Sequence, residues 1–210
     1  SRDHVIWVFF IHTGRRPGDL YAVDVDDLHL DDEDPYIVIK HRPDETELKN
    51  GKAGETQISI STECAQIFEN YIDTHRINEE TANGRQPFLT SQNGRLSKVS
   101  IRKTIYAYSR PCVVTGECPH NRDSKSCEAM TNKNTAYKCP SSKPPYALRH
   151  GYITAKRRKG VPVDIVSDRC DVSEEVIDKH YDERTDDEKR KLRKQVLEEV
   201  RADTDQEGYL

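Results

Sequence analysis

The chain has 210 residues, and 37 acidic against 33 basic side chains give it a net charge of −4. It therefore lacks the overall basic excess that is typical of nucleic-acid-binding proteins, although local basic clusters can still bind DNA. No apolar run approaches the ~20 residues of a membrane span, and no signal peptide is visible, so we expect a cytoplasmic protein without a membrane partner. The start at Ser1, without methionine, suggests the C-terminal part of a longer protein.

The first third of the chain mixes helix-forming and strand-forming segments. Apolar spacing predicts helices at 5–13 and 16–28. Runs of β-branched residues predict strands at 36–41 and 56–61, joined by the polar connection "RPDETELKNGKAGE". These two strands would form a small antiparallel sheet.

The remainder is predominantly helical. Helices are predicted at 62–77 and 99–110, with a short hairpin or extended segment at 88–97 between them. The C-terminal third reads as several helices and ends in a charged helix at about 186–202. The predicted fold class is α+β: a mostly helical domain with a small antiparallel sheet near its N-terminal third.

Residues 112–139 interrupt this pattern, because they are rich in cysteine and poor in aliphatic side chains. Four thiolates, or three with a histidine, can hold a structural zinc ion in a tetrahedral site. The alternative is a loop with four reduced cysteines, and the irregular spacing leaves both interpretations open. The candidate zinc ligands are Cys112, Cys118, His120, Cys127 and Cys139.

Three motifs carry residues suited to phosphodiester chemistry. "TGRRPGD" (13–19) and "YALRHG" (146–151) each place an arginine near the start of a helix, and "VIDKHYD" (176–182) places a tyrosine near the end of another. Two guanidinium groups can bind the nonbridging oxygens of one phosphate and stay charged at physiological pH. Each residue taken alone also has a structural interpretation, such as a helix-end ion pair or a half-buried aromatic ring.

The order and spacing of these motifs resemble the tyrosine recombinase (phage integrase) family, and in particular its archaeal branch. "TGRRPGD" is similar to the family's "TGLRxSE", which would make Arg16 the first catalytic arginine and Asp19 its supporting acid. "YALRH" is similar to "HxLRH", which assigns Arg149 as the second arginine and His150 as a supporting residue, with Tyr146 in place of the usual histidine.

The family's third motif, "LGHSS…TxxxY", resembles "RCDVSEEVIDKHY" and places the nucleophile at Tyr181. The family's histidine or tryptophan nine residues before the nucleophile falls on Val172, which we expect to be a core residue. The family's catalytic lysine lies between the second and third strands, where Lys49 is favoured and Lys52 is the alternative.

The resemblance implies a catalytic domain over residues 1–210 that cleaves and rejoins DNA through a 3′-phosphotyrosine link, without a catalytic cofactor. The implied partners are a specific double-stranded attachment site and three further copies in a tetramer. Residues expected to contact DNA are Arg102, Lys103, Lys156, Arg157 and Arg158. The alternatives are a DNA-binding regulatory protein that kept this fold without its chemistry, a zinc-stabilised helix-turn-helix protein, and a type IB topoisomerase.

Overall fold

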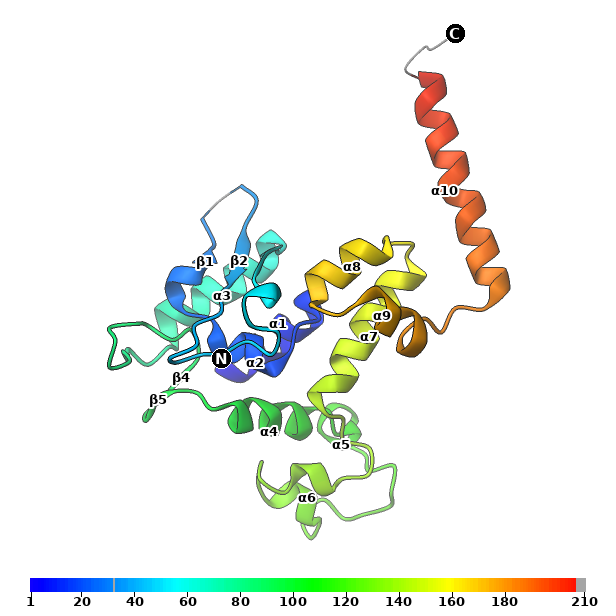
Figure 1. Ribbon diagram of the computed structural model, residues 1–210. Helices are drawn as coiled ribbons and strands as arrows, with labels where there is room; N and C mark the ends of the chain where they lie inside the picture. Colours follow the sequence, from blue (N-terminus) through cyan, green and yellow to red (C-terminus); the bar gives the residue numbers. More distant parts are fainter. Residues whose placement is uncertain (32, 207–210) are drawn as a thin grey trace.

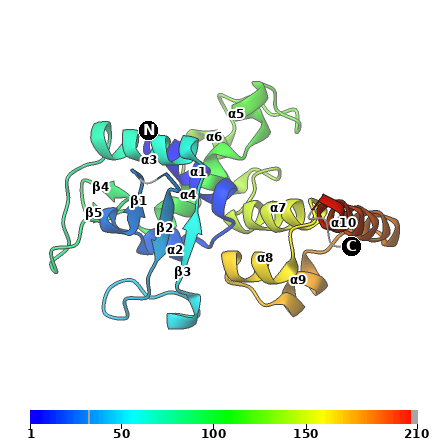
Figure 2. The same ribbon diagram turned by 90° about the horizontal axis from the view of Figure 1, so that it is seen from above.

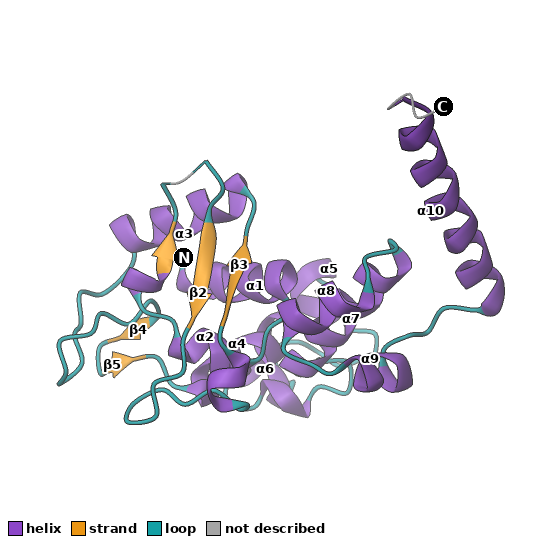
Figure 3. Ribbon diagram, turned by 45° about the horizontal axis from the view of Figure 1, so that its top comes forward, coloured by secondary structure: helices purple, strands orange, loops and turns teal. Residues whose placement is uncertain are grey.

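A three-stranded antiparallel sheet and the helices behind it form the N-terminal half of the computed structural model, which describes residues 1–31 and 33–206 (Figures 1 and 3). The strand order is β1-β2-β3, with Ile37 opposite Leu28 on one side and Ile58 on the other. The strands and the helices packed with them are β1 (Leu28–His29), β2 (Tyr36–Ile39), β3 (Thr56–Ser59), α1 (Arg2–Thr13), α2 (Pro17–Ala22), α3 (Thr62–Thr74) and α4 (Lys98–Tyr108). Alternate residues of β2, Ile37 and Ile39, are buried, which is the period-2 pattern of a sheet with one face on the core.

The C-terminal half is a group of helices beside this sheet domain, with α1 and α7 packed against each other between them (Figures 1 and 2). Its elements are α7 (Pro145–Arg158), α8 (Val163–Cys170), α9 (Glu174–His180) and α10 (Asp186–Gln206). A second, smaller core joins α7, α8 and α9 through Ile153, Val166 and Ile177, and it includes Tyr181. The predicted fold class is confirmed: the described chain is mostly helical, with its small antiparallel sheet near the N-terminal third.

The helix predicted over 16–28 is shorter than expected. Helix α2 ends at Ala22, a 3₁₀ turn spans Val25–Asp27, and β1 follows directly. The carboxylate of Asp27 accepts a hydrogen bond from the backbone N–H of Asp24 at 3.0 Å, so aspartates in "DVDD" cap a new turn rather than continue the helix. The predicted hairpin at 88–97 is present as β4 (Thr90–Ser91) and β5 (Gly94–Arg95).

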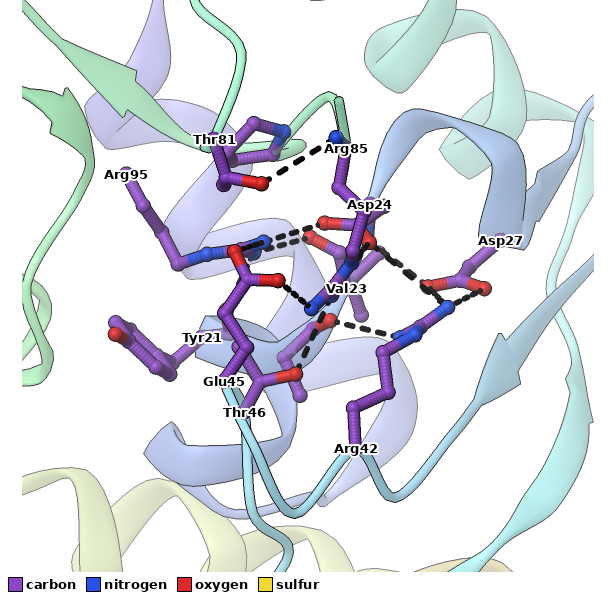
Figure 4. Close-up of polar contacts among 12 residues, drawn as sticks. Tyr21, Val23, Asp24, Asp27, Arg42, Glu45, Thr46, Thr81, Arg85 and Arg95 are labelled. Carbon is purple, nitrogen blue, oxygen red and sulfur yellow. Dashed lines mark hydrogen bonds and ion pairs between the residues drawn. The ribbon is translucent and has the colours of Figure 1, made fainter. Parts of the chain in front are cut away.

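A network of ion pairs around the buried carboxylates of Asp24 and Asp27 anchors the base of the connection between β2 and β3 (Figure 4). Arg42 contacts both carboxylate oxygens of Asp27, at 2.7 and 2.9 Å, and Arg85 joins Glu45 at 2.7 Å. Asp24 accepts from Arg85, and from Arg95 at 2.7 Å. The network fixes residues 42–46 against the start of β1, so the following segment, 48–54, leaves the sheet from a defined point.

The structure does not support the predicted zinc site. Among the side chains that the structure describes, no three of His, Cys, Asp or Glu lie close enough together to hold a metal. The thiol of Cys112 faces the Met130 sulfur at 3.7 Å, and His120 Nε2 contacts Ser141 Oγ at 2.9 Å, so two of the five candidate ligands have other partners. The segment folds instead through short helical turns, α5 (Pro111–Thr115), α6 (Glu128–Thr131) and η3 (Ala136–Lys138).

The predicted C-terminal helix is present as α10, and most of it extends away from the other helices (Figures 1 and 3). Leu192 lies against Gly160, just past the C-terminus of α7. Farther along, Val196 and Leu197 are 44% and 59% exposed, so α10 leaves part of its apolar stripe uncovered. No helix in the described part of the chain has the length and apolar character needed to cross a membrane.

Candidate active site

The turn between α1 and α2 presents the first arginine, and Gly14 makes this turn possible. Gly14 ends α1 with φ 65°, and a Cβ added there would lie 2.3 Å from the ring of Tyr152, so both backbone conformation and space require glycine. Arg16 then occupies the N-cap of α2, with Pro17 at the first helical position. The Arg16 backbone N–H donates to Asp19 Oδ2 at 3.0 Å, so the supporting acid of the motif holds this turn together.

Arg149 lies at the centre of the site and is 5% exposed. Its Nη1 donates to the carbonyl oxygen of Gly14 at 3.0 Å and to that of Cys170, and its Nη2 lies 3.4 Å from the carbonyl oxygen of Asp171. Burial lowers the pKa of Arg149, and the positive charge of Arg16 lowers it further. The two guanidinium groups, one from α2 and one from α7, are therefore close enough for the charge of Arg16 to act on Arg149.

Tyr181 lies beside Arg149 and is 4% exposed. It caps the C-terminus of α9, and its backbone carbonyl accepts a hydrogen bond from Thr154 Oγ1 on α7 at 3.1 Å. An interaction between the Tyr181 hydroxyl and Arg149 partly opposes the lowering of the arginine pKa. The chain thus brings Arg16, Arg149 and Tyr181 together within one protomer.

Two further residues of α7 surround the tyrosine. The rings of Tyr146 and His150 lie 6.1 and 5.0 Å from the ring of Tyr181, centroid to centroid. A hydrogen bond with the Tyr181 hydroxyl raises the pKa of Tyr146, so the Tyr146 phenol keeps its proton more firmly than an isolated phenol. His150 Nε2 also contacts the carbonyl oxygen of His180 at 3.1 Å, which holds the end of α9 against α7.

The connection between β2 and β3 reaches the site through its tip. Asn50 Nδ2 donates to Asp171 Oδ1 at 2.8 Å, and the backbone of Gly54 approaches the Asp171 carboxylate so closely that an added Cβ would lie 3.1 Å from it. Lys49 and Lys52 flank this contact, and both side chains are exposed. The backbone of the tip therefore carries both ammonium groups close to the Asp171 side of the site, while the lysine side chains themselves are exposed.

Arg15 is a site residue that the motif comparison missed, because it stands where "TGLRxSE" has leucine. It is 1% exposed, its Nε donates to Asp19 Oδ2 at 2.8 Å, and its Nη2 donates to the carbonyl oxygen of Gly54 at 2.8 Å. A buried guanidinium thus ties α2 to the turn after Lys52. The only sequence signal is the unusual pair of adjacent arginines, which does not say which of the two is buried.

The remaining residues of the motifs and basic clusters lie on or next to α4, α7 and α8. Val172 is partly buried against the second core, and its carbonyl accepts from Ser167 Oγ at 2.7 Å. Arg102 and Lys103 lie on α4. The cations at the end of α7 have neighbours of their own: Lys156 lies over the ring of Tyr152 at 5.3 Å, Arg157 donates to the Val161 carbonyl at 2.9 Å, and Arg158 lies 3.8 Å from Glu183.

Comparison with known proteins identifies the fold. No protein family model and no curated protein match this sequence. Among solved structures, the Tn1549 transposon integrase in complex with a circular intermediate DNA matches 92% of this chain with a TM-score of 0.64 and 16% identity. XerA recombinase matches 92% with a TM-score of 0.58 and 16% identity, and XerH recombinase bound to its difH substrate matches 95% with a TM-score of 0.57 and 14% identity.

The fold is that of the tyrosine recombinases. The matched part is 58% of the integrase chain, 56% of XerA and 46% of XerH, so this chain spans about half the length of these neighbours. At 14 to 16% identity this likeness establishes the fold alone.

Proposed function

We propose that this chain is the catalytic part of a site-specific DNA recombinase or integrase that works through a 3′-phosphotyrosine intermediate. The observation that carries the proposal is the convergence of two guanidinium groups and one buried phenol. Arg149 interacts with the Tyr181 hydroxyl and lies close enough to Arg16 for their charges to interact. The motif resemblance, including that to the archaeal branch, supports the same assignment.

In the proposed reaction the Tyr181 oxygen attacks the phosphorus of one phosphodiester bond. An O–P bond forms to the phenol, the bond to the 5′-oxygen breaks, and the products are a 3′-phosphotyrosine and a free 5′-hydroxyl. The energy of the broken bond is kept in the new phosphodiester, so rejoining requires no ATP. Arg16 and Arg149 would stabilise the charge on the pentacoordinate transition state, which is commonly the largest single contribution to such catalysis.

Two proton transfers accompany this step. The Tyr181 proton has to leave as the phenol attacks, and Tyr146 and His150 are the groups whose rings lie next to it. His150 would accept this proton, either directly or by relay through Tyr146, whose hydroxyl takes up the Tyr181 proton as it passes its own on. Lys49 or Lys52, at the tip of the β2–β3 connection, would protonate the leaving 5′-oxygen.

DNA would be bound by several protomers, as the resemblance implies. The basic residues of α4 and of the end of α7 are the proposed phosphate contacts outside the cleavage site: Arg102, Lys103, Lys156, Arg157 and Arg158. Helix α10, with Val196 and Leu197 exposed, is the segment proposed to pack on a neighbouring protomer in a tetramer.

Covalent capture tests the proposal. The chain is incubated with a pool of nicked duplexes of randomised sequence, adducts that survive denaturant are isolated, and mass spectrometry maps the modified residue. We expect an adduct on Tyr181, its loss in Tyr181→Phe, and formation slowed by about 10²–10⁴ in Tyr146→Phe if the second phenol assists proton transfer. Tyr137→Phe is the control, because Tyr137 is 60% exposed and outside the site.

A DNA-binding protein without the chemistry would retain duplex binding and give no adduct with any variant. Adduct formation that is unchanged in Tyr181→Phe would equally refute the assignment of the nucleophile.

A further inference from the structure

Asp171 occupies the position on Arg16 where a phosphate would have to bind. Asp171 follows α8 in the left-handed conformation, with φ 52°, and its side chain is only 10% exposed. Its carboxylate oxygen Oδ2 pairs with Arg16 Nη1, and its backbone carbonyl accepts from Arg16 Nη2. Asp171 therefore accepts hydrogen bonds from both terminal nitrogens of the guanidinium group that the proposed reaction assigns to the phosphate.

The same carboxylate also reaches the β2–β3 connection. Its second oxygen, Oδ1, accepts from Asn50 Nδ2 at 2.8 Å, and both flank a cleft of about 220 Å³ that Arg15 and Gly54 also line. Asp171 thus joins two parts of the site: the arginine of α2 and the tip that carries Lys49 and Lys52.

A phosphate and the Asp171 carboxylate cannot share this arginine. The carboxylate holds Nη1 and the Asp171 carbonyl holds Nη2, so a phosphate that binds the guanidinium through both nitrogens meets Asp171 at each of them, and two like charges at one site repel each other. A phosphate that reaches Arg16 must displace the carboxylate, which then loses its hydrogen bond from Asn50 if it moves away.

The negative charge at this position is not required by the backbone. The motif "LGHSS" has a glycine directly before its histidine, and Asp171 stands at that glycine when Val172 is placed at the histidine. Glycine and asparagine both tolerate a φ of 52°. The backbone therefore explains why a small residue is needed here, and it does not explain a carboxylate that points at Arg16.

We infer that Asp171 is a specificity-determining residue, an inference that rests on the proposed function. Its carboxylate prevents free phosphate anions from binding Arg16. A phosphate group of a DNA duplex displaces this carboxylate, because the duplex makes many other contacts with the protein. The displacement removes the hydrogen bond from Asn50, so the lysine-bearing tip keeps its link from Arg15 to Gly54 but loses its contact with Asp171 when DNA occupies the site.

Binding of inorganic phosphate to the whole chain provides a test that needs no DNA target. The rise in melting temperature with phosphate concentration, at constant ionic strength, gives the dissociation constant, because a ligand that binds only the folded state stabilises it by RT ln(1 + [L]/Kd). We expect Asp171→Asn to bind phosphate about tenfold more tightly than wild type, which corresponds to about 1.4 kcal/mol. Asp171→Gly, which also suits the left-handed backbone, should show a gain of the same size.

Asp168→Asn is the matched control. Asp168 lies on α8, the helix that Asp171 follows, and it lines the same cleft. Its side chain is exposed, and its replacement changes the net charge by the same amount. Its phosphate affinity should stay within about twofold of wild type, since no carboxylate has been removed from Arg16. In the double variant Arg16→Gln with Asp171→Asn the gain should disappear.

Three results would overturn the inference: equal affinity in wild type and both Asp171 variants, an equal gain in Asp168→Asn, or a gain that survives Arg16→Gln. The adduct assay on Tyr181 reports the proposed function separately. An adduct without a phosphate effect would refute the role of Asp171 alone, and a phosphate effect without an adduct would refute the recombinase chemistry alone.

Discussion

The two adjacent arginines of "TGRRPGD" should differ sharply in what they contribute to stability. Arg15 is 1% exposed, and its partner Asp19 is also 1% exposed. Replacing Arg15 with methionine keeps a long unbranched side chain in place but leaves the Asp19 carboxylate without its cation. Breaking a buried pair by removing one partner costs about 3–5 kcal/mol.

The structure narrows this range for Arg15→Met. Asp19 keeps the hydrogen bond from the Arg16 backbone at 3.0 Å, which favours the lower end, whereas the Gly54 carbonyl loses its 2.8 Å donor. We therefore expect a loss of about 3 kcal/mol in the free energy of unfolding, measured by urea titration followed by circular dichroism. For a domain of this size the melting temperature should fall by about 6–12 °C.

Arg16→Met is the matched comparison. The Arg16 side chain is 20% exposed, and Asp171 keeps Asn50 as a partner when the arginine is removed. This variant should lose only about 1 kcal/mol, as expected for an ion pair near the surface, while losing adduct formation. Equal destabilisation of the two variants would refute the division between a structural Arg15 and a phosphate-binding Arg16.

Two further predictions concern the β2–β3 connection. If Lys49 or Lys52 protonates the leaving oxygen, the corresponding alanine variant should slow adduct formation by about 10²–10⁴. A substrate with a 5′-bridging sulfur needs no protonation of its leaving group, so it should restore the rate of adduct formation in that variant. Lack of rescue in both variants would exclude a lysine acid. Burial raises the pKa of Asp27, but the hydrogen bonds and charge of Arg42 lower it more, so the net shift is downward. The stability from this carboxylate is complete above its unfolded pKa of about 3.9 and is lost as the pH falls further, so Asp27→Asn should flatten the decline in unfolding free energy between about pH 4 and pH 2.

The fold class and the elements that carry the site could be predicted from the sequence, because they depend on the periodicity of apolar residues and on turn residues. Gly14 shows how far this goes: its φ of 65° ends α1 and starts the turn that presents Arg16. The sequence also placed Arg16, Arg149 and Tyr181 in one site by motif order, and the structure brings their side chains together. Their catalytic roles stay predictions until an adduct is mapped.

The contacts that could not be predicted from the sequence depend on the three-dimensional positions of the side-chain ends. Nothing in "GRR" distinguishes a fully buried arginine from its partly buried neighbour, because the difference comes from the approach of Gly54, 39 residues away. The contact of Asp171 with Arg16 spans 155 residues and is equally invisible in either segment. The zinc prediction was not supported for the related reason that cysteine spacing does not establish that the thiols converge.

The site can hold several arginines close together because helix ends supply negative potential. The C-terminus of α1 and the C-terminus of α8 both point at it, and their last carbonyl groups have no partner within their own helices. Arg149 satisfies carbonyls from both helix ends, those of Gly14 and Cys170. Arg149 is thus balanced by main-chain oxygens before any DNA arrives, which explains how it is buried beside Arg16 although burial and that neighbour both lower its pKa. Because these carbonyls belong to the fold itself, they hold Arg149 in place whether or not Asp171 is displaced, and Arg16 is the arginine whose partner changes when a phosphate binds.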